Sequence, residues 1–386
     1  MKKYSLILLI FSFFFQSAMA QDAVSILKKA EEFCKTIQWG SYEMDVTFKG
    51  LMSTDTTVTK YDCKYSKLEA DSISPASFRV ERHWQKKLSH TYIYSGEDFI
   101  SLFARDSTGD ILSKELWPAE VKKAIKEANL FRPLTARSKP VFFSGEDFTD
   151  SANLFITEKD EKINGRDCYH IRIINKEKSN TSGFAINQVT FDLWIINDYY
   201  LPIQYATTIE MMNGNMPMQQ YALYTLKTFS INWPDTKKKY DITDAPAYYR
   251  LKNYEPYQRK EQLINGTTAP ALSGKNIDGK KISLDDYKGK VVLIDFFYMA
   301  CAPCILSFPH IKAIYRKYAD SGVVVLGVNP VDKKEAQVRA FLKKYEIPYP
   351  VIFPDDDLIT KNYIIQGYPC FYLVNKKGNI AFSLPG

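Results

Sequence analysis

One stretch of sequence decides the fold of the C-terminal part of the chain: Val291-Val-Leu-Ile-Asp-Phe-Phe-Tyr-Met-Ala-Cys301-Ala-Pro-Cys304-Ile-Leu-Ser-Phe-Pro309. It begins with a continuous apolar run, passes through a short loop to a Cys-x-x-Cys pair, and continues in a helical pattern. This order predicts a buried parallel strand that leads directly into a helix. Two cysteines at the start of that helix predict a redox site.

The Cys-x-x-Cys spacing suits thiol chemistry. It places both cysteines on one face of the helix, where the unpaired amides of the first turn and the helix dipole stabilise a thiolate. We expect Cys301 to be the exposed nucleophile with a low pKa, and Cys304 to be the buried thiol that resolves a mixed disulfide. Pro303 fits the first helical turn, where its missing amide has no helical partner anyway.

A structural disulfide and half of a zinc site are the alternatives for this pair. A zinc site needs a second pair of ligands, the sequence has no other Cys-x-x-Cys, and His310 alone cannot complete one. A bridge that closes so small a loop would stabilise little. We therefore predict redox function, with no metal and no cofactor.

Further motifs follow the same order as in a known family. They are Ala269-Pro270-Ala-Leu, Asp278-Gly-Lys-Lys-Ile-Ser-Leu-Asp-Asp-Tyr-Lys-Gly-Lys290, Gly322-Val-Val-Val-Leu-Gly-Val-Asn329, Phe353-Pro-Asp and Gly367-Tyr-Pro-Cys-Phe-Tyr-Leu-Val-Asn-Lys-Lys-Gly378. With the Cys-x-x-Cys stretch, they make residues 268–386 resemble the TlpA/ResA branch of the thioredoxin superfamily. The resemblance implies an α/β fold with a four- to five-stranded mixed sheet flanked by helices.

The resemblance also implies site residues. Pro369 matches the cis-proline whose loop faces the redox cysteines, and Pro303, Tyr368 and Cys370 fall at its docking surface. For Cys370, participation in redox chemistry and burial as a small apolar side chain are both open.

Asp295 matches the buried acid that thioredoxins place beneath the second cysteine, which implies a proton acceptor for Cys304. The alternative for Asp295 is a carboxylate satisfied by a neighbouring amide. Two positions depart from the family pattern: Ala300 replaces an aromatic residue, and Ser307 replaces an acidic one.

The first twenty residues have the three parts of a secretory signal peptide: Lys2 and Lys3, the apolar run from Tyr4 to Phe15, and the small residues before a cleavage site after Ala20. The apolar run is short for a membrane span, and Gln21 rather than cysteine follows the site, so no lipid anchor is indicated. We expect a soluble, exported, periplasmic protein. Cleavage removes two lysines and changes the formal charge from +7 to +5, too weak to indicate nucleic-acid binding.

The remaining sequence suggests a second domain. A helix is predicted over residues 23–37, and alternating aromatic and polar residues then predict a large antiparallel sheet, interrupted by a helix over residues 118–129. We predict a β-rich α+β domain over residues 21–232, a linker over residues 233–265 that is rich in proline and charge, and a thioredoxin-like domain over residues 266–386.

The predicted N-terminal domain resembles the LolA-like periplasmic carriers in Gly165-Arg-Asp-Cys-Tyr-His-Ile-Arg-Ile173 and Phe191-Asp-Leu-Trp-Ile-Ile-Asn-Asp-Tyr-Tyr-Leu-Pro202. That resemblance implies a half-barrel with a hydrophobic concavity for an apolar ligand. The alternative is that the aromatic residues are simply the core under a sheet.

The other three cysteines of this part are Cys34, Cys63 and Cys168. Export permits a disulfide between two of them, with Cys63 and Cys168 the first candidate and buried free thiols the alternative. At the other end, a thioredoxin fold normally adds one more helix beyond the strand at residues 379–382, and the sequence stops at Gly386. Either that face is covered by the N-terminal domain or by a partner, or the sequence is incomplete at this end.

These observations predict an exported thiol-disulfide oxidoreductase that acts on protein disulfides through Cys301. The resemblance implies a membrane reductase of the electron-relay type as electron donor, and exported proteins, apocytochromes among them, as clients. A hydrophobic-ligand or lipoprotein carrier with a docking thioredoxin-like domain is one alternative. A peroxiredoxin-type peroxidase is the other, although its Thr-x-x-Cys loop is absent around Cys301.

Overall fold

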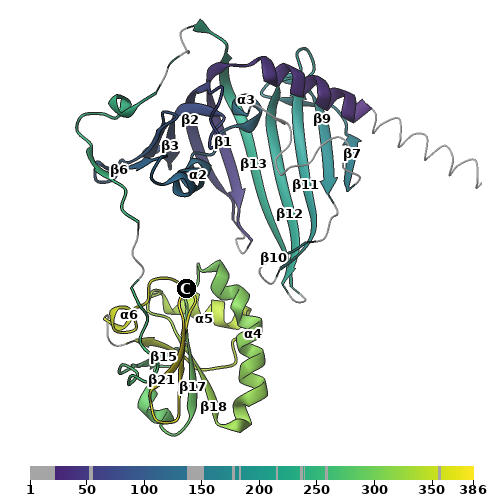
Figure 1. Cartoon of the computed structure of the whole chain (residues 1–386). Coiled ribbons are helices and arrows are strands. Elements are labelled where there is room, and N and C mark those ends of the chain that lie inside the picture. Colours follow the sequence, from purple (N-terminus) through teal and green to yellow (C-terminus); the bar gives the residue numbers. More distant parts are fainter. Residues whose placement is uncertain are drawn as a thin grey trace, which may run out of the picture. The chain divides into compact units, whose positions relative to one another are not determined.

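The computed structural model divides the chain into two compact units, Met1–Glu255 and Pro256–Gly386 (Figure 1). It describes residues 22–51, 55–136, 152–175, 179–181, 184–213, 216–234, 238, 240–256, 260–354 and 358–386. The predicted signal peptide, residues 1–20, lies outside this range. None of the helices in the described ranges is both long and apolar enough to cross a membrane.

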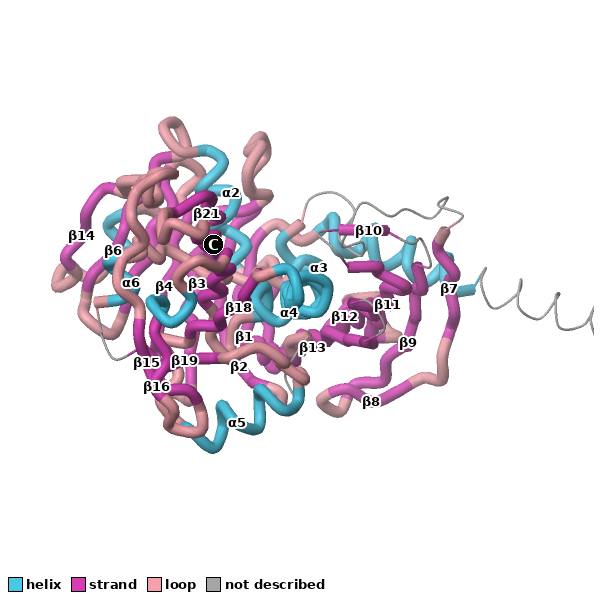
Figure 2. The backbone as a smooth tube through the Cα atoms, turned by 90° about the horizontal axis from the view of Figure 1, so that it is seen from below, coloured by secondary structure: helices cyan, strands magenta, loops and turns pink. Residues whose placement is uncertain are grey.

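The N-terminal unit is built on one sheet, in which the described residues supply fourteen strands. The strands are β1 (Trp39–Lys49), β2 (Thr57–Lys67), β3 (Ala76–Trp84), β4 (Lys87–Tyr94), β5 (Asp98–Phe103), β6 (Thr108–Ser113), β7 (Asn153–Thr157), β8 (Glu161–Ile163), β9 (Arg166–Asn175), β10 (Ser179–Thr181), β11 (Phe184–Ile196), β12 (Pro202–Asn213), β13 (Met216–Ile231) and β14 (Arg250–Asn253). Their order is β14-β6-β5-β4-β3-β2-β1-β13-β12-β11-β9-β7, with β10 on β11 and β8 on β9. Figures 1 and 2 both show β13, β12, β11 and β9 in this succession.

The alternation in the sequence sets the inner face of this sheet. Tyr42, Met44 and Val46 of β1 are buried, and so are Tyr61 and Cys63 of β2. They join a core cluster with side chains from the helix over residues 22–36, from α2 (Pro118–Glu127) and from α3 (Arg132–Thr135). The inward aromatic side chains thus form a packed core, while the half-barrel and its apolar ligand stay predictions.

The segment predicted as a linker differs in the structure. Its β14 pairs in parallel with β6, following the short helix η2 (Ile242–Asp244). Tyr240 and Tyr249 pack in a second core cluster with Ile93 and Ile100. The segment therefore belongs to the N-terminal unit up to residue 255, because two buried tyrosines and a strand anchor it where proline and charge alone suggested an extended chain.

The predicted bridge between Cys63 and Cys168 is wrong, since Cys34, Cys63 and Cys168 are all buried free thiols. Cys63 lies on β2 and Cys168 on β9, and the strands β1, β13, β12 and β11 lie between them. The two cysteines therefore do not lie on neighbouring strands of the sheet.

The C-terminal unit has a seven-stranded mixed sheet in the order β16-β15-β19-β18-β17-β20-β21. The strands are β15 (Ser273–Asn276), β16 (Lys281–Ser283), β17 (Val291–Phe296), β18 (Val323–Val328), β19 (Val351–Pro354), β20 (Cys370–Val374) and β21 (Ile380–Leu384). The helices are η3 (Leu284–Tyr287), α4 (Ala302–Tyr318), η4 (Ala319–Ser321), α5 (Glu335–Lys344) and α6 (Ile359–Asn362). Among the strands of this unit that the structure describes, β17, β18 and β19 are the parallel ones.

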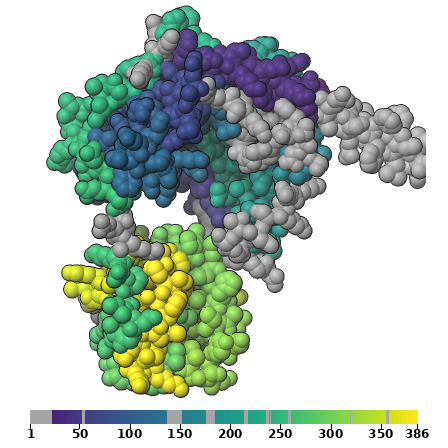
Figure 3. All heavy atoms as spheres, viewed as in Figure 1, coloured from purple at the N-terminus to yellow at the C-terminus, as the bar shows by residue number. Residues whose placement is uncertain are grey.

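The expectation of four to five strands was too low, because the hairpin β15–β16 extends the sheet beyond β19. The opposite edge strand is β21, where Phe382 and Leu384 are about half exposed. Figure 3 shows this end of the chain, in yellow, on the surface of the unit.

The two faces of β17 are lined by different partners. Val292, Ile294 and Phe296 pack in a core cluster with Tyr363 and Tyr372. Phe297, which continues β17 through a hydrogen bond to Val328, turns to the other face and contacts Phe308 of α4 with ring centroids 5.5 Å apart. Because side chains alternate along a strand, Asp295 shares the face of Phe297, under α4.

Candidate redox-active site

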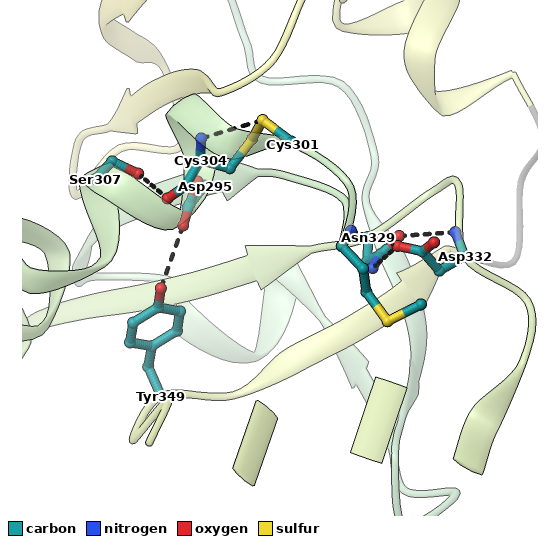
Figure 4. Close-up of a disulfide and its surroundings, with 8 residues drawn as sticks. Asp295, Cys301, Cys304, Ser307, Asn329, Asp332 and Tyr349 are labelled. Carbon is teal, nitrogen blue, oxygen red and sulfur yellow. Dashed lines mark hydrogen bonds between the residues drawn. A yellow bond between two sulfur atoms is a disulfide. The ribbon is translucent and has the colours of Figure 1, made fainter. Parts of the chain in front are cut away.

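The Cys301–Cys304 pair is closed as a disulfide at the start of α4, with the two Cα atoms 5.2 Å apart (Figure 4). The backbone amide of Cys304 donates a hydrogen bond of 3.1 Å to the Cys301 sulfur. The Cys301 carbonyl accepts from the Ile305 amide at 3.2 Å and so begins the helical ladder. Pro303, exposed in the first turn, forfeits no helical bond. The helix start thus directs an amide donor at Cys301, as its thiolate requires.

Both cysteines are buried in this oxidised state. Cys304 has no exposed surface, as expected of a resolving thiol, but Cys301 is only 2% exposed, against the expectation of an exposed nucleophile. The Cys301 sulfur is bonded to that of Cys304 and lies against the Cys304 amide, so the disulfide leaves little of it to solvent. The accessibility of the Cys301 thiol to solvent is therefore to be measured by alkylation of the reduced protein.

The loop that carries Cys301 is anchored to the loop after β18. The Asp332 carboxylate accepts hydrogen bonds from the Met299 backbone amide at 2.7 Å and from the Asn329 side-chain amide at 2.8 Å. Asn329, itself buried, accepts from the backbone amide of Val331 at 3.1 Å. It also accepts from the backbone amide of Asp332 at 3.0 Å (Figure 4). We call this set of hydrogen bonds around Asp332 the Asp332 clamp. It was not predicted from the sequence, where its only signal was a pair of polar residues, Asn329 and Asp332, after the parallel strand next to the redox strand.

Asp295 is fully buried on β17. Its Oδ2 accepts a hydrogen bond of 3.2 Å from the Tyr349 hydroxyl, and its Oδ1 has no hydrogen-bond partner among the described residues. Burial raises the pKa of the Asp295 carboxyl to about 7, while the hydrogen bond from Tyr349 lowers it. The alternative of satisfaction by a neighbouring amide is wrong, because the one donor is a tyrosine hydroxyl. A carboxyl with this pKa exchanges protons near neutral pH.

The cis-proline expected from the family pattern is present, since the Tyr368–Pro369 peptide bond is cis. The Tyr368 ring meets the Tyr298 ring edge to face, with centroids 5.2 Å apart. Tyr298 lies three residues before Cys301, so this contact ties the cis-proline loop to the cysteine loop. The geometry brings Pro369 and the redox pair to one end of the sheet.

Cys370 is not at a docking surface. Its side chain is fully buried, and it pairs across the sheet with Phe296, on the face away from α4. Both belong to the core cluster with Tyr372. The prediction of a docking role for Cys370 is therefore wrong for this state, because an unexposed side chain cannot touch a docked protein. Of its two open interpretations, the packing favours a small apolar core residue.

Ser307, where the family pattern has an acid, turns back onto its own helix. Its hydroxyl donates a hydrogen bond of 2.7 Å to the Cys304 carbonyl. It therefore satisfies backbone near the pair and adds no titrating group there. His310 is exposed on α4, as its position in the helix suggested.

One group of possible metal ligands occurs in the described part of the N-terminal unit. Donor atoms of Asp62, Glu81 and His83 lie within 4.8 Å of one another. His83 lies 2.9 Å from Asp62, and Arg79 lies 2.8 Å from Glu81. Ion pairs within the protein account for this cluster, so it does not indicate a metal centre.

Comparison with known proteins concerns the C-terminal unit. The model of the AhpC/TSA family matches residues 265–383. Thioredoxin-like protein YneN of Bacillus subtilis is 37% identical over 129 residues, which cover 33% of this chain and 75% of that protein. Thiol-disulfide oxidoreductase ResA of Bacillus thuringiensis subsp. konkukian is 31% identical over 134 residues, which cover 34% of this chain and 77% of that protein.

A solved structure is also similar: the thioredoxin domain of a thiol-disulfide oxidoreductase from Bacteroides vulgatus, at 30% sequence identity. The alignment covers 32% of this chain and 91% of that domain, with a TM-score of 0.31.

Proposed function

The chain belongs to the thioredoxin-like thiol-disulfide oxidoreductases, and we propose that it is exported and reduces or exchanges the disulfides of other exported proteins through Cys301. The observation that carries the proposal is the disulfide at the start of α4, beside a buried Asp295 and a cis-proline loop. The remaining four cysteines of the chain form no disulfide, so we assign the exchange reaction to the Cys301–Cys304 pair.

The proposed reaction starts from the reduced pair. The Cys301 thiolate, stabilised by the helix start and the Cys304 amide, attacks one sulfur of a client disulfide and displaces the other as a thiolate. This step forms a mixed disulfide between Cys301 and the client. The Cys304 thiol then passes its proton to Asp295 and attacks the Cys301 sulfur, which releases the second client thiolate. Two electrons have moved to the client, and the product is the disulfide seen here.

Client recognition is proposed for the loop end of the sheet. Pro369 and Tyr368 lie beside the cysteine loop through the contact between Tyr368 and Tyr298, and Pro303 is exposed next to the pair. An extended client segment can lie along the cis-proline loop and pair with its backbone groups. Exported proteins, apocytochromes among them, are the proposed clients, and a membrane reductase of the electron-relay type is the proposed source of electrons.

The peroxidase alternative has one observation in its favour, the match to the AhpC/TSA family model. Against it, Tyr298 stands three residues before Cys301 where the Thr-x-x-Cys loop would need threonine. Consumption of peroxide by the reduced protein at a rate that depends on Cys301 would favour this alternative over disulfide exchange. The carrier alternative would gain support if lipid co-purified with the full chain.

The deciding experiment is thiol trapping of the full chain across a series of redox buffers. We expect Cys301 and Cys304 to convert together and reversibly, in a two-electron transition that the Cys304→Ser variant lacks. A potential near −270 mV, about that of thioredoxin, would identify a reductant, and one near −120 mV an oxidant. Without a reversible paired transition, the proposed function would be wrong.

A further inference from the structure

Tyr349 lies in the loop between α5 and β19 and has only 4% of its surface exposed. Its hydroxyl donates the 3.2 Å hydrogen bond to Asp295 Oδ2, and Asp295 accepts no other hydrogen bond in the described part of the chain. The second carboxylate oxygen, Oδ1, is buried and has no hydrogen-bond partner among the described residues. Because Tyr349 donates to Oδ2, Oδ1 is the oxygen that no donor occupies, and it is therefore the oxygen more open to a proton. Figure 4 shows Tyr349 pointing at Asp295.

The neighbouring strand is shaped to let Tyr349 reach this position. Gly327 of β18 lies directly beside Asp295 in the parallel register. A Cβ atom at Gly327 would lie 2.9 Å from the Val351 side chain and 3.2 Å from the rings of Phe297 and Tyr349, tighter than ordinary van der Waals contact. The missing side chain at Gly327 therefore leaves room for these three side chains, among them the tyrosine that holds Asp295.

Among the described residues, no charged side chain forms a hydrogen bond with Asp295. The buried residues of α4 are Cys304 of the disulfide and the apolar Ile305, Phe308 and Ile311. Tyr315 of the same helix has its ring 6.0 Å from that of Tyr349. Lys312 of α4 is held by the Tyr345 carbonyl at the end of α5, at 3.0 Å. Gly327 of β18 and Phe371 of β20, the strand neighbours of Asp295, are uncharged. Burial and the Tyr349 hydroxyl are thus the two influences on the Asp295 carboxyl.

We propose that Tyr349 is a positioning residue for the resolving step: its hydroxyl fixes Oδ2 of Asp295 and leaves Oδ1 as the oxygen that takes the proton of Cys304. The inference deepens the proposed function and rests on it. In this step the Cys304 S–H bond breaks and an O–H bond forms at Oδ1. The Cys304 sulfur then bonds to the Cys301 sulfur, the bond from Cys301 to the client sulfur breaks, and the client sulfur leaves as a thiolate. Tyr349 itself stays protonated throughout, since burial, followed by the proximity of Asp295, raises its pKa.

Loss of the Tyr349 hydroxyl should shift the pH dependence of the resolving step in one direction, toward higher pH. Since the hydroxyl of Tyr349 stabilises the charged form of Asp295, its removal raises the pH at which Asp295 becomes a base. The resolving step should then be slower near neutral pH and recover in alkali, where Asp295 is ionised in either protein. If Tyr349 had a purely structural role, its removal would slow the resolving step or destabilise the protein by the same factor at every pH.

The test is a single-turnover reaction of the reduced full chain with a chromogenic aromatic disulfide. The first chromophore released reports attack by Cys301, and the second reports attack by Cys304 on the mixed disulfide. In Tyr349→Phe we expect the midpoint of the second phase to move up by about one pH unit, with a rate at pH 7 roughly fivefold lower and an unchanged first phase. Tyr345→Phe is the matched control, because Tyr345 is a buried tyrosine of the same layer, whose ring centroid lies 4.7 Å from that of Phe341 in a tilted contact.

An unchanged midpoint in Tyr349→Phe, or an equal shift in Tyr345→Phe, would overturn the positioning role. Carbon-13 NMR of the Asp295 carboxyl gives a second measurement that does not depend on turnover, and its titration should move in the same direction. Failure of the proposed function has a different signature, since the wild-type protein would then show no second phase at all.

Discussion

The Asp332 carboxylate accepts a 2.7 Å hydrogen bond from the backbone amide of Met299, two residues ahead of Cys301. The loop after β18 thereby holds the loop that presents the nucleophile. Since Asn329 donates to the same carboxylate at 2.8 Å, removal of Asp332 leaves two donors near the buried site without their acceptor.

Asp332→Ala should therefore lower the free energy of unfolding by about 1–3 kcal/mol, the usual effect of leaving partly buried donors unsatisfied. Denaturant titration of the full chain measures it. Lys334→Ala, at an exposed position of the same loop, is the control and should change stability by less than about 0.5 kcal/mol. Equal stability of the two variants would mean that the clamp contributes nothing.

Thiol counting tests the cysteine assignment. The chain has six cysteines, of which Cys301 and Cys304 form the disulfide and four are free thiols. Alkylation in denaturant without reductant should therefore label four cysteines, and reduction should raise the count to six. The count for Cys301→Ser, which frees Cys304, should be five before reduction. Only two labelled cysteines in the unreduced wild type would show a second disulfide and contradict the structure.

A third prediction concerns Cys370, whose thiol faces the core cluster on the side of the sheet away from α4. In Cys304→Ser, mild oxidation should leave Cys301 as a thiol or as a mixed disulfide with a small thiol, with no Cys301–Cys370 bridge detectable by mass spectrometry of peptides. The double variant Cys304→Ser, Cys370→Ser should give the same products. A Cys301–Cys370 peptide would restore the redox interpretation of Cys370.

The C-terminal site could be predicted from the sequence more completely than the fold of the N-terminal unit, for physical reasons. A Cys-x-x-Cys pair after an apolar run specifies its own local geometry, and the cis bond before Pro369 followed from the family pattern. The hydrogen bonds that Asp332 and Tyr349 form with the redox site could not be predicted from the sequence. Asp332 follows its partner Met299 by 33 residues, and Tyr349 follows its partner Asp295 by 54 residues, so no local pattern links either pair.

Long-range order also explains the errors. The candidate pairing of Cys63 with Cys168 joined two predicted strands, yet whether two strands lie near each other depends on which hairpins assemble side by side. The predicted linker contained Tyr240 and Tyr249, whose burial depends on a surface formed by β4 and β5. Alternation predicted the buried face of β2 and most of that of β1, because it is a property of each strand alone, although Phe48 near the end of β1 is exposed.

The last prediction follows from the buried carboxyl of Asp295, whose pKa is raised to about 7 in the folded protein. The unfolded chain releases this proton near pH 4, so between about pH 4 and pH 7 the folded state binds more protons than the unfolded state. The free energy of unfolding must then fall as the pH rises through this window, by on the order of a few kcal/mol. Asp295→Asn should remove that slope, and the variant should be more stable than the wild type above pH 7.

Denaturant titrations of the oxidised full chain at pH 5 and at pH 8 measure the effect. Glu346→Gln, at an exposed carboxyl of the same unit, is the control and should keep the wild-type slope. The same Asp295→Asn variant should slow the second chromophore release near neutral pH, because Cys304 loses its proton acceptor. If Asp295→Asn were more stable and still released the second chromophore at the wild-type rate, Asp295 would not be the proton acceptor of Cys304. Its burial would then cost stability without serving the exchange reaction.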